Sequence, residues 1–105
     1  MAHLYRNYIN GNWVEAKSGS TLENRNPANR NDLIGLFAAS GPEDVSEAVG
    51  AAKAAFAKWR LVPAPKRGEI LGRVGELLRG HKEEIARSMT REMGKILKES
   101  RGDVQ

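Results

Sequence analysis

The chain has 105 residues, with no cysteine, 17 Lys or Arg and 13 Asp or Glu, and its formal net charge is +4. The lack of cysteine excludes a disulfide scaffold, a zinc–thiolate site and a thiol nucleophile within these residues. No apolar run approaches the roughly 20 residues that span a membrane, and the N-terminus lacks the apolar core of a secretory signal, so we expect a cytoplasmic protein without a membrane partner.

Large apolar residues are few for this length. Leu, Ile, Val and Phe make up about a fifth of the chain, and alanine supplies much of the remaining hydrophobic fraction. At about 25 cal/mol per Å² of buried apolar surface, such a core leaves little stability once chain entropy is subtracted. We therefore expect a fold that is only marginally stable alone and more stable when it packs against a larger partner surface.

The first third of the chain has the pattern of short strands and turns. Asn10-Gly11 supplies the two positive-φ residues of a type I′ turn, and β-branched or aromatic residues flank it, which predicts a hairpin over Tyr8–Val14. Further turns are predicted at 18–20 and 26–29, and strands at Thr21–Arg25 and Asp32–Ala39.

Helices are predicted from position 40 onward. Ser40 is the expected N-cap of the first, with Glu43 as its capping-box partner. A second helix is predicted from about Pro65 to Gly80, and a third from Lys82 to Gly94. The apolar residues expected to face inward are Val45, Ala48, Val49, Ala52, Phe56, Trp59, Ile70, Leu71, Val74, Leu77, Leu78, Ile85, Met89 and Met93.

The order of these elements predicts an α+β chain, in which an N-terminal hairpin and short strands (1–39) are followed by three to four helices (40–105). There is no βαβα alternation, so the chain is not expected to close a parallel sheet by itself. The last segment, Lys95–Gln105, has helical character but no terminal Gly, Asn or Pro, which favours a helix that continues in a longer protein.

No catalytic pattern emerges from the residues themselves. His3 and His81 have no second ligand at metal-binding spacing, and Glu83-Glu84 is typical of a charged first helical turn. Gly72 and Gly75 lie inside a predicted helix, so they are not a dinucleotide motif and instead suggest close approach of another element. Basic and acidic residues alternate along the helices, which disfavours a nucleic-acid partner.

Five motifs in a fixed order nevertheless resemble a known family. They are Tyr8-Ile9-Asn10-Gly11-Asn12-Trp13-Val14, Asn26-Pro27-Ala28-Asn29, the Ala-rich stretch from Glu43 to Trp59, Arg67-x-x-Ile70-Leu71, and Glu92-Met93-Gly94-Lys95. Together they are similar to the N-terminal region of the NAD(P)-dependent aldehyde dehydrogenase superfamily, and the similarity runs from about Tyr8 to Gln105. Arg30 stands where that family commonly has glycine.

The resemblance implies an α/β parent fold with a Rossmann-like cofactor domain, of which residues 1–105 would be the N-terminal part, without the catalytic domain. The parent would oxidise an aldehyde to a carboxylic acid with NAD or NADP. The family's nucleophilic cysteine, its glutamate base and its cofactor-binding residues match no position here. We therefore assign no catalytic and no cofactor-binding residue to this chain, and we expect it to be inactive alone and to bind no cofactor.

One further site is implied by the resemblance. Some family members hold a structural monovalent cation near the Asn-Pro turn, and the matching positions are Asn24, Arg25 and Asn26, through backbone carbonyls, and Asp103. Oxygen ligands suit a hard cation. The alternative is that Asp103 is a surface acid near a helix end.

The expected partner is the remainder of an aldehyde dehydrogenase polypeptide, within a homo-oligomeric parent. The alternatives are a stand-alone truncated module for binding or oligomerisation, and a small basic nucleic-acid binder. Met93 stands where threonine is commoner in the family, which favours parents that oxidise semialdehydes or aldehydes in general.

Overall fold

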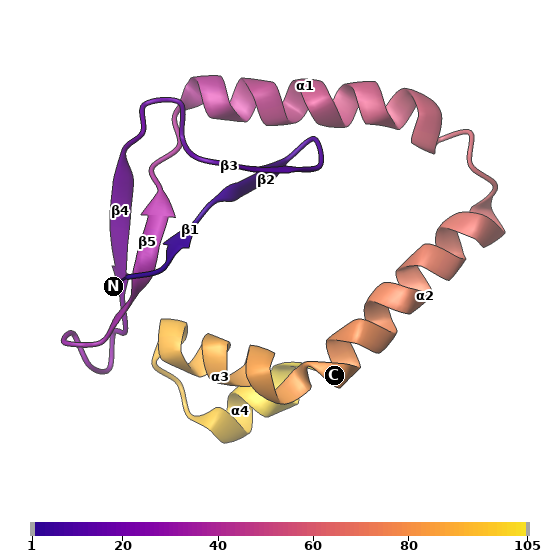
Figure 1. Cartoon of the computed structure of the whole chain (residues 1–105). Helices are drawn as coiled ribbons and strands as arrows, with labels where there is room; N and C mark the ends of the chain where they lie inside the picture. Colours follow the sequence, from indigo (N-terminus) through magenta and orange to yellow (C-terminus); the bar gives the residue numbers. More distant parts are fainter. Residues whose placement is uncertain (1, 105) are drawn as a thin grey trace. The chain divides into compact units, whose positions relative to one another are not determined.

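A computed structural model describes residues 2–104 (Figure 1). The chain forms two compact units, one built from the residues up to Asn24 and from Leu33–Leu61, and the other from Arg25–Asp32 and the residues from Val62 onward. Strands precede helices along the chain, so the predicted α+β character is confirmed. The compact units, however, do not follow the division between strands and helices at residues 39 and 40.

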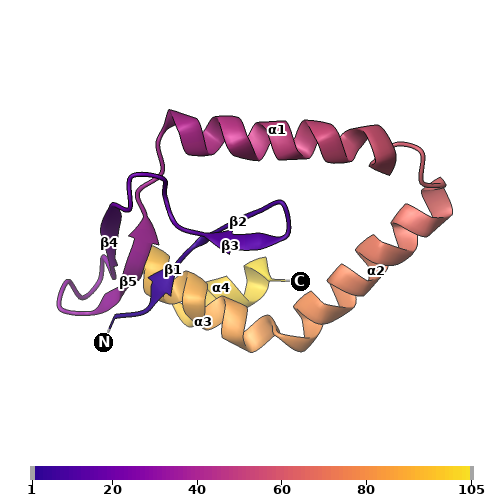
Figure 2. The same cartoon turned by 45° about the horizontal axis from the view of Figure 1, so that its top comes forward.

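The first unit contains a two-stranded hairpin made of β2 (Asn7–Ile9) and β3 (Asn12–Val14), as predicted. Asn10 and Gly11 have φ values of 52° and 79°, as a type I′ turn requires. Tyr8 lies opposite Trp13, and their ring centroids are 4.8 Å apart. The hairpin contacts α1 through β2, and Figures 1 and 2 show the two elements side by side.

A three-stranded sheet has the order β1 (Leu4–Tyr5), β5 (Leu33–Ala38), β4 (Thr21–Arg25). The strands β4 and β5 were predicted, whereas β1 and its parallel pairing with β5 were not. Gly35 permits this pairing, because a Cβ at that position would lie 2.5 Å from the ring of Tyr5 and 2.9 Å from the carbonyl oxygen of His3. The Tyr5 ring also stacks on the ring of Phe37, with centroids 4.6 Å apart.

Helix α1 (Pro42–Trp59) begins one residue later than predicted. Its N-cap is Gly41 and the acidic partner is Asp44, so the prediction of Ser40 and Glu43 in these roles was wrong. Asp44 is 6% exposed, and its carboxylate accepts hydrogen bonds from the backbone N–H groups of Gly41 (2.9 Å) and Lys17 (3.0 Å). These bonds, the Gly41 one foremost, lower the pKa of Asp44. Ser40 instead accepts a hydrogen bond from the amide of Asn7.

The second unit contains α2 (Ala64–Gly80), α3 (Lys82–Met93) and α4 (Leu97–Asp103). Gly94 ends α3 in the left-handed conformation with φ 78°, and Ile96 is extended, so the helix predicted from Lys95 starts only at Leu97. Helices α3 and α4 pack together over Ala86 and Ser100, which have no exposed surface. The Oγ1 of Thr90 and the Oγ of Ser100 lie 2.7 Å apart across this contact.

Little apolar surface is buried. Among the described residues, only Ala16 and Ala86 are buried hydrophobic side chains. Most of the side chains predicted to face inward are instead exposed, including Phe56 (60%) and Leu77 (64%). The prediction of a second element close to Gly72 and Gly75 is also not met within residues 2–104, because a Cβ at either position would have no neighbour within 4 Å.

Candidate functional site

The residues predicted to hold a cation lie at the end of β4, in the turn that follows it, and on α4. Asn24 belongs to the first compact unit, and Arg25, Asn26 and Asp103 belong to the second. The carbonyl oxygen of Asn26 accepts the N–H of Asn29, and its side-chain oxygen accepts the N–H of Ala28. The Asp103 carboxylate forms an ion pair with Lys95. The oxygen donors suit a hard cation, but a cation at Asp103 would compete with the ammonium group of Lys95.

The turn after β4 is fixed to α3 by a charged pair. The guanidinium of Arg91 donates to both carboxylate oxygens of Asp32, and Asn26 donates to the same carboxylate. The hydrogen bond from Arg91 is the main reason that the pKa of Asp32 falls from 3.8 to about 2. Gly94 also approaches this turn, since a Cβ there would lie 3.1 Å from Cγ of Pro27.

A second charged pair joins α3 to α4. Arg101 donates from Nε and from its terminal nitrogen to the two carboxylate oxygens of Glu83, at 2.8 and 2.7 Å. Arg87 contacts the same carboxylate at 3.1 Å. Hydrogen bonding from Arg101 lowers the pKa of Glu83 from 4.5 to about 2. The Glu83-Glu84 pair therefore has the structural role that its place in a first helical turn predicted.

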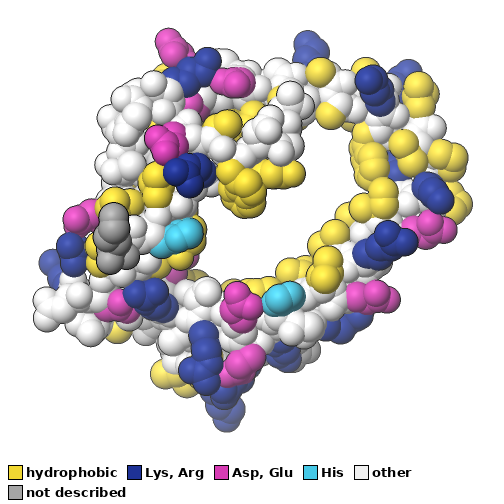
Figure 3. Space-filling model, viewed as in Figure 1, with side chains coloured by type: hydrophobic (Ala, Val, Ile, Leu, Met, Phe, Trp, Pro, Cys, Tyr) yellow, Lys and Arg dark blue, Asp and Glu magenta, His cyan; other side chains and the backbone are white. Residues whose placement is uncertain are grey.

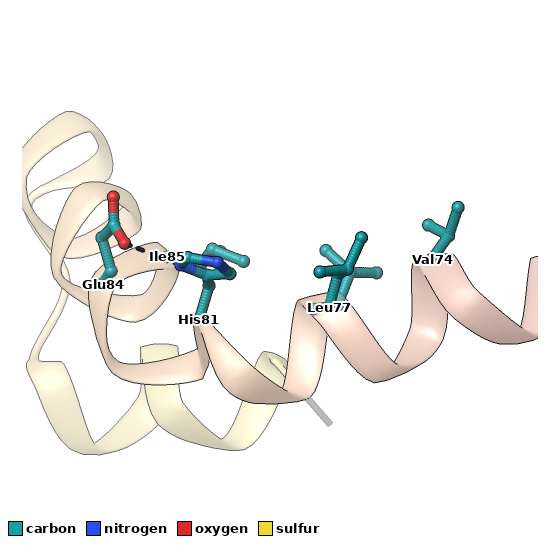
Figure 4. Close-up of a pocket in the computed structure, with 6 residues that line it drawn as sticks. Val74, Leu77, His81, Glu84 and Ile85 are labelled. Atoms are coloured by element: carbon teal, nitrogen blue, oxygen red, sulfur yellow. Dashed lines mark hydrogen bonds and ion pairs between the residues drawn. The ribbon is translucent and has the colours of Figure 1, made fainter.

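An open apolar groove crosses the junction of α2 and α3 (Figure 4). His81 is the residue between the two helices, and its Nδ1 lies 3.0 Å from a carboxylate oxygen of Glu84. In Figure 4 the side chains of Val74 and Leu77 stand on the same side of the ribbon as that of His81. The groove is lined by Val74, Leu77, Leu78, His81, Glu84 and Ile85. One polar pair in an apolar surface suits contact with protein better than chemistry on a small substrate.

The groove is part of a longer exposed surface on α2. We define the α2 stripe as Arg67, Leu71, Val74, Leu77, Leu78 and His81, which recur at intervals of three or four residues. Its apolar members are between 46% and 67% exposed. Figure 3 shows hydrophobic side chains gathered along α2. Sequence periodicity identified the apolar members of this stripe correctly as one face, but it assigned that face to the core of the chain.

Arg67 is a member of this stripe that sequence reasoning did not single out. Its Nε is buried and has no hydrogen-bond partner in the described part of the chain. The only earlier signal was its place in the motif Arg67-x-x-Ile70-Leu71. A buried donor without an acceptor is costly, so it marks a place where an acceptor is missing.

Residues 2–104 bring together no group of three or more His, Asp or Glu side chains that could hold a metal ion. Among the helices in this part of the chain, none combines the length and the apolar character needed to cross a membrane.

The fold is found in solved structures of nucleotide-dependent dehydrogenases. The crystal structure of an NAD-dependent aldehyde dehydrogenase from Sinorhizobium meliloti matches with a TM-score of 0.92 and 28% identity, over 99% of this chain and 21% of that chain. The family model described as "Aldehyde dehydrogenase family" matches residues 13–105. The chain therefore belongs to the aldehyde dehydrogenase family, and the resemblance found in the sequence is confirmed.

Curated relatives of similar sequence are aldehyde dehydrogenases as well. The α-ketoglutarate semialdehyde dehydrogenase of Haloferax volcanii is 42% identical over 100 residues, which are 95% of this chain and 21% of the relative. Malonate-semialdehyde dehydrogenase 2 of Geobacillus kaustophilus is 45% identical over 100 residues, which are 95% of this chain and 20% of the relative. The chain thus spans about a fifth of the length of the relatives it matches.

Proposed function

We propose that this chain is the N-terminal scaffold segment of an enzyme that oxidises an aldehyde to a carboxylic acid with NAD or NADP. The observation that carries the proposal is the exposed apolar surface of α1 and α2, on a chain that matches one fifth of its relatives' length. Apolar faces of this extent are unusual on a free monomer of this size and are typical of surfaces that pack against other protein. The rest of the polypeptide would supply that protein.

The chain alone contributes no catalytic group to this reaction. It has no cysteine, so the thiohemiacetal that the family's nucleophile forms with the aldehyde cannot arise here. We propose that residues 1–105 are part of the cofactor-binding domain of a homo-oligomeric parent. The cofactor would be held by residues that follow this segment.

We further propose that the substrate is a semialdehyde. Two observations support this class: Met93 in the Glu92-Met93-Gly94-Lys95 motif, and relatives named for α-ketoglutarate semialdehyde and malonate semialdehyde. We also retain the proposal that Asn24, Arg25, Asn26 and Asp103 hold a monovalent cation in the parent, supported by their oxygen donors.

The test joins the full chain to the remainder of the Geobacillus kaustophilus enzyme, in place of the region that it matches. We expect this chimera to reduce NAD or NADP when malonate semialdehyde is added, measured by absorbance of the reduced nicotinamide. The chain alone should show no turnover with either cofactor. Turnover by the chain alone at enzymatic rates, or an inactive chimera, would contradict the proposal. Cooperative unfolding of the isolated chain without binding of an apolar dye would favour a stand-alone module instead.

A further inference from the structure

We propose that the α2 stripe is covered in the parent enzyme by polypeptide that follows the matched region, and that this polypeptide places a carboxylate on the guanidinium of Arg67. The inference rests on the proposed function and adds to it the chemistry of the partner segment.

The first argument is the state of Arg67. It is the half-buried charged residue of a helix whose other charged side chains are exposed, and its Nε has no acceptor. Ordinarily a buried guanidinium nitrogen is hydrogen-bonded, and carboxylates match its planar fork with two parallel bonds. Within the described residues, Arg91 and Arg101 each donate two hydrogen bonds to a single carboxylate.

The second argument is the charge at the start of α2. Helices α1, α3 and α4 each carry an acidic residue in the first turn, whereas α2 carries none. It has Lys66 and Arg67 there instead, and the positive end of the helix dipole disfavours cations at this place. Lys66 has Glu69 at 3.7 Å. An external carboxylate at Arg67 would complement both the guanidinium and the helix terminus.

The third argument concerns what covers the stripe. The apolar side chains between Arg67 and His81 are exposed. The relatives are about five times as long as the region matched here, so they contain ample polypeptide for this purpose. A partner segment that is apolar along its length and acidic at one end fits the surface that α2 presents.

The experiment uses the chimera with the Geobacillus kaustophilus enzyme and three substitutions. Arg67→Met keeps most of the stem volume and removes the charge, Arg67→Lys keeps the charge, and Arg73→Met removes an exposed charge from the same helix. The readout is the half-life of irreversible thermal inactivation. We expect Arg67→Met to shorten it at least about tenfold, because a carboxylate would be left buried and unpaired. We expect Arg67→Lys to recover most of the loss, and Arg73→Met to change the half-life less than about twofold.

Each outcome bears on a separate statement. An active chimera in which Arg67→Met and Arg73→Met behave alike would overturn the inference and leave the proposed function standing. If Arg67→Met fails to fold, Arg67→Lys is the deciding variant. A lysine variant that also fails to fold contradicts a charge interaction at this position. A lysine variant that folds and keeps most of the inactivation half-life supports it. A chimera that neither folds nor oxidises the aldehyde would overturn the proposed function and this inference with it.

Discussion

Arg91 binds Asp32 through both carboxylate oxygens, although the two residues are 59 positions apart in the sequence. The pair joins the turn after β4 to the last part of α3, and Asn26 adds a third hydrogen bond to the same carboxylate. A loop that the sequence marks only as an Asn-Pro turn is thereby held against a helix.

Replacement of Asp32 should make the free energy of unfolding depend less on pH in the acid range. The pKa of Asp32 is about 2 in the folded chain and 3.8 ordinarily, so its ionised form stabilises the fold fully above the ordinary value. That contribution disappears as the pH falls through about 2. Asp32→Asn should therefore unfold at lower urea concentration than the natural chain at pH 7, and the two curves should converge only as the pH falls to about 2 and below. Glu76→Gln, at an exposed position of α2, is the control; equal midpoints for Asp32→Asn and the natural chain at pH 7 would contradict the prediction.

Two arginines that share one carboxylate should differ in their effect on α4. Arg101 holds Glu83 through two bonds from α4, whereas Arg87 makes a single contact from within α3. We expect Arg101→Gln to speed amide hydrogen exchange throughout α4, and Arg87→Gln to leave α4 nearly unchanged. Identical exchange in the two variants would show that the pair does not anchor the helix.

Gly94→Ala should destabilise the chain by about 1–2 kcal/mol. The residue has φ 78°, and its added methyl group would lie 3.1 Å from Pro27. Gly72→Ala is the matched control in a helix interior, where nothing lies within 4 Å of the new Cβ. That control should stabilise the isolated chain by about 0.5–1 kcal/mol, measured by urea unfolding. A stabilising Gly94→Ala would mean that the turn has another conformation.

Local chemistry made much of this fold predictable. Asn10 and Gly11 specify their hairpin turn, and Gly94 specifies the end of α3, because each needs a backbone conformation that few residues adopt. The pairing of β1 with β5 could not be predicted, since Leu4–Tyr5 is too short to show any periodicity and its partner lies about 30 residues away.

The candidate site was less predictable than the fold, for a different physical reason. The spacing of Leu71, Val74 and Leu78 shows that they share one face, but spacing does not reveal whether that face meets this chain or another part of a protein. The sequence likewise does not show that the Nε of Arg67 is buried without an acceptor, because that depends on the residues that surround it in the folded chain. Asp103 was assigned to the cation site only from the family resemblance. Its ion pair with Lys95 could not be predicted, because it depends on how α4 folds relative to the segment before it.

Ser100→Ala should cost about 1–2 kcal/mol of unfolding free energy. Ser100 has no exposed surface, and its hydroxyl is the partner of the Thr90 hydroxyl between α3 and α4. Removal leaves the Thr90 hydroxyl in a partly buried place with one hydrogen bond fewer. Ser88→Ala, at an exposed position of α3, should stay within about 0.5 kcal/mol of the natural chain. A loss no larger than that of Ser88→Ala would show that water replaces the missing hydroxyl.

Potassium should stabilise the chain through the proposed cation site, and Lys95 should limit the effect. The ammonium group of Lys95 occupies the Asp103 carboxylate that a cation would need. We expect thermal unfolding to occur at higher temperature in potassium chloride than in tetramethylammonium chloride of equal ionic strength, because the larger ion cannot enter a site of oxygen ligands. The difference in unfolding temperature should grow in Lys95→Met and vanish in Asp103→Asn. It should stay unchanged in Lys98→Met, which alters an exposed lysine of α4, the helix that carries Asp103. Equal unfolding temperatures in the two salts, for both the natural chain and Lys95→Met, would leave Asp103 as a surface acid paired with Lys95.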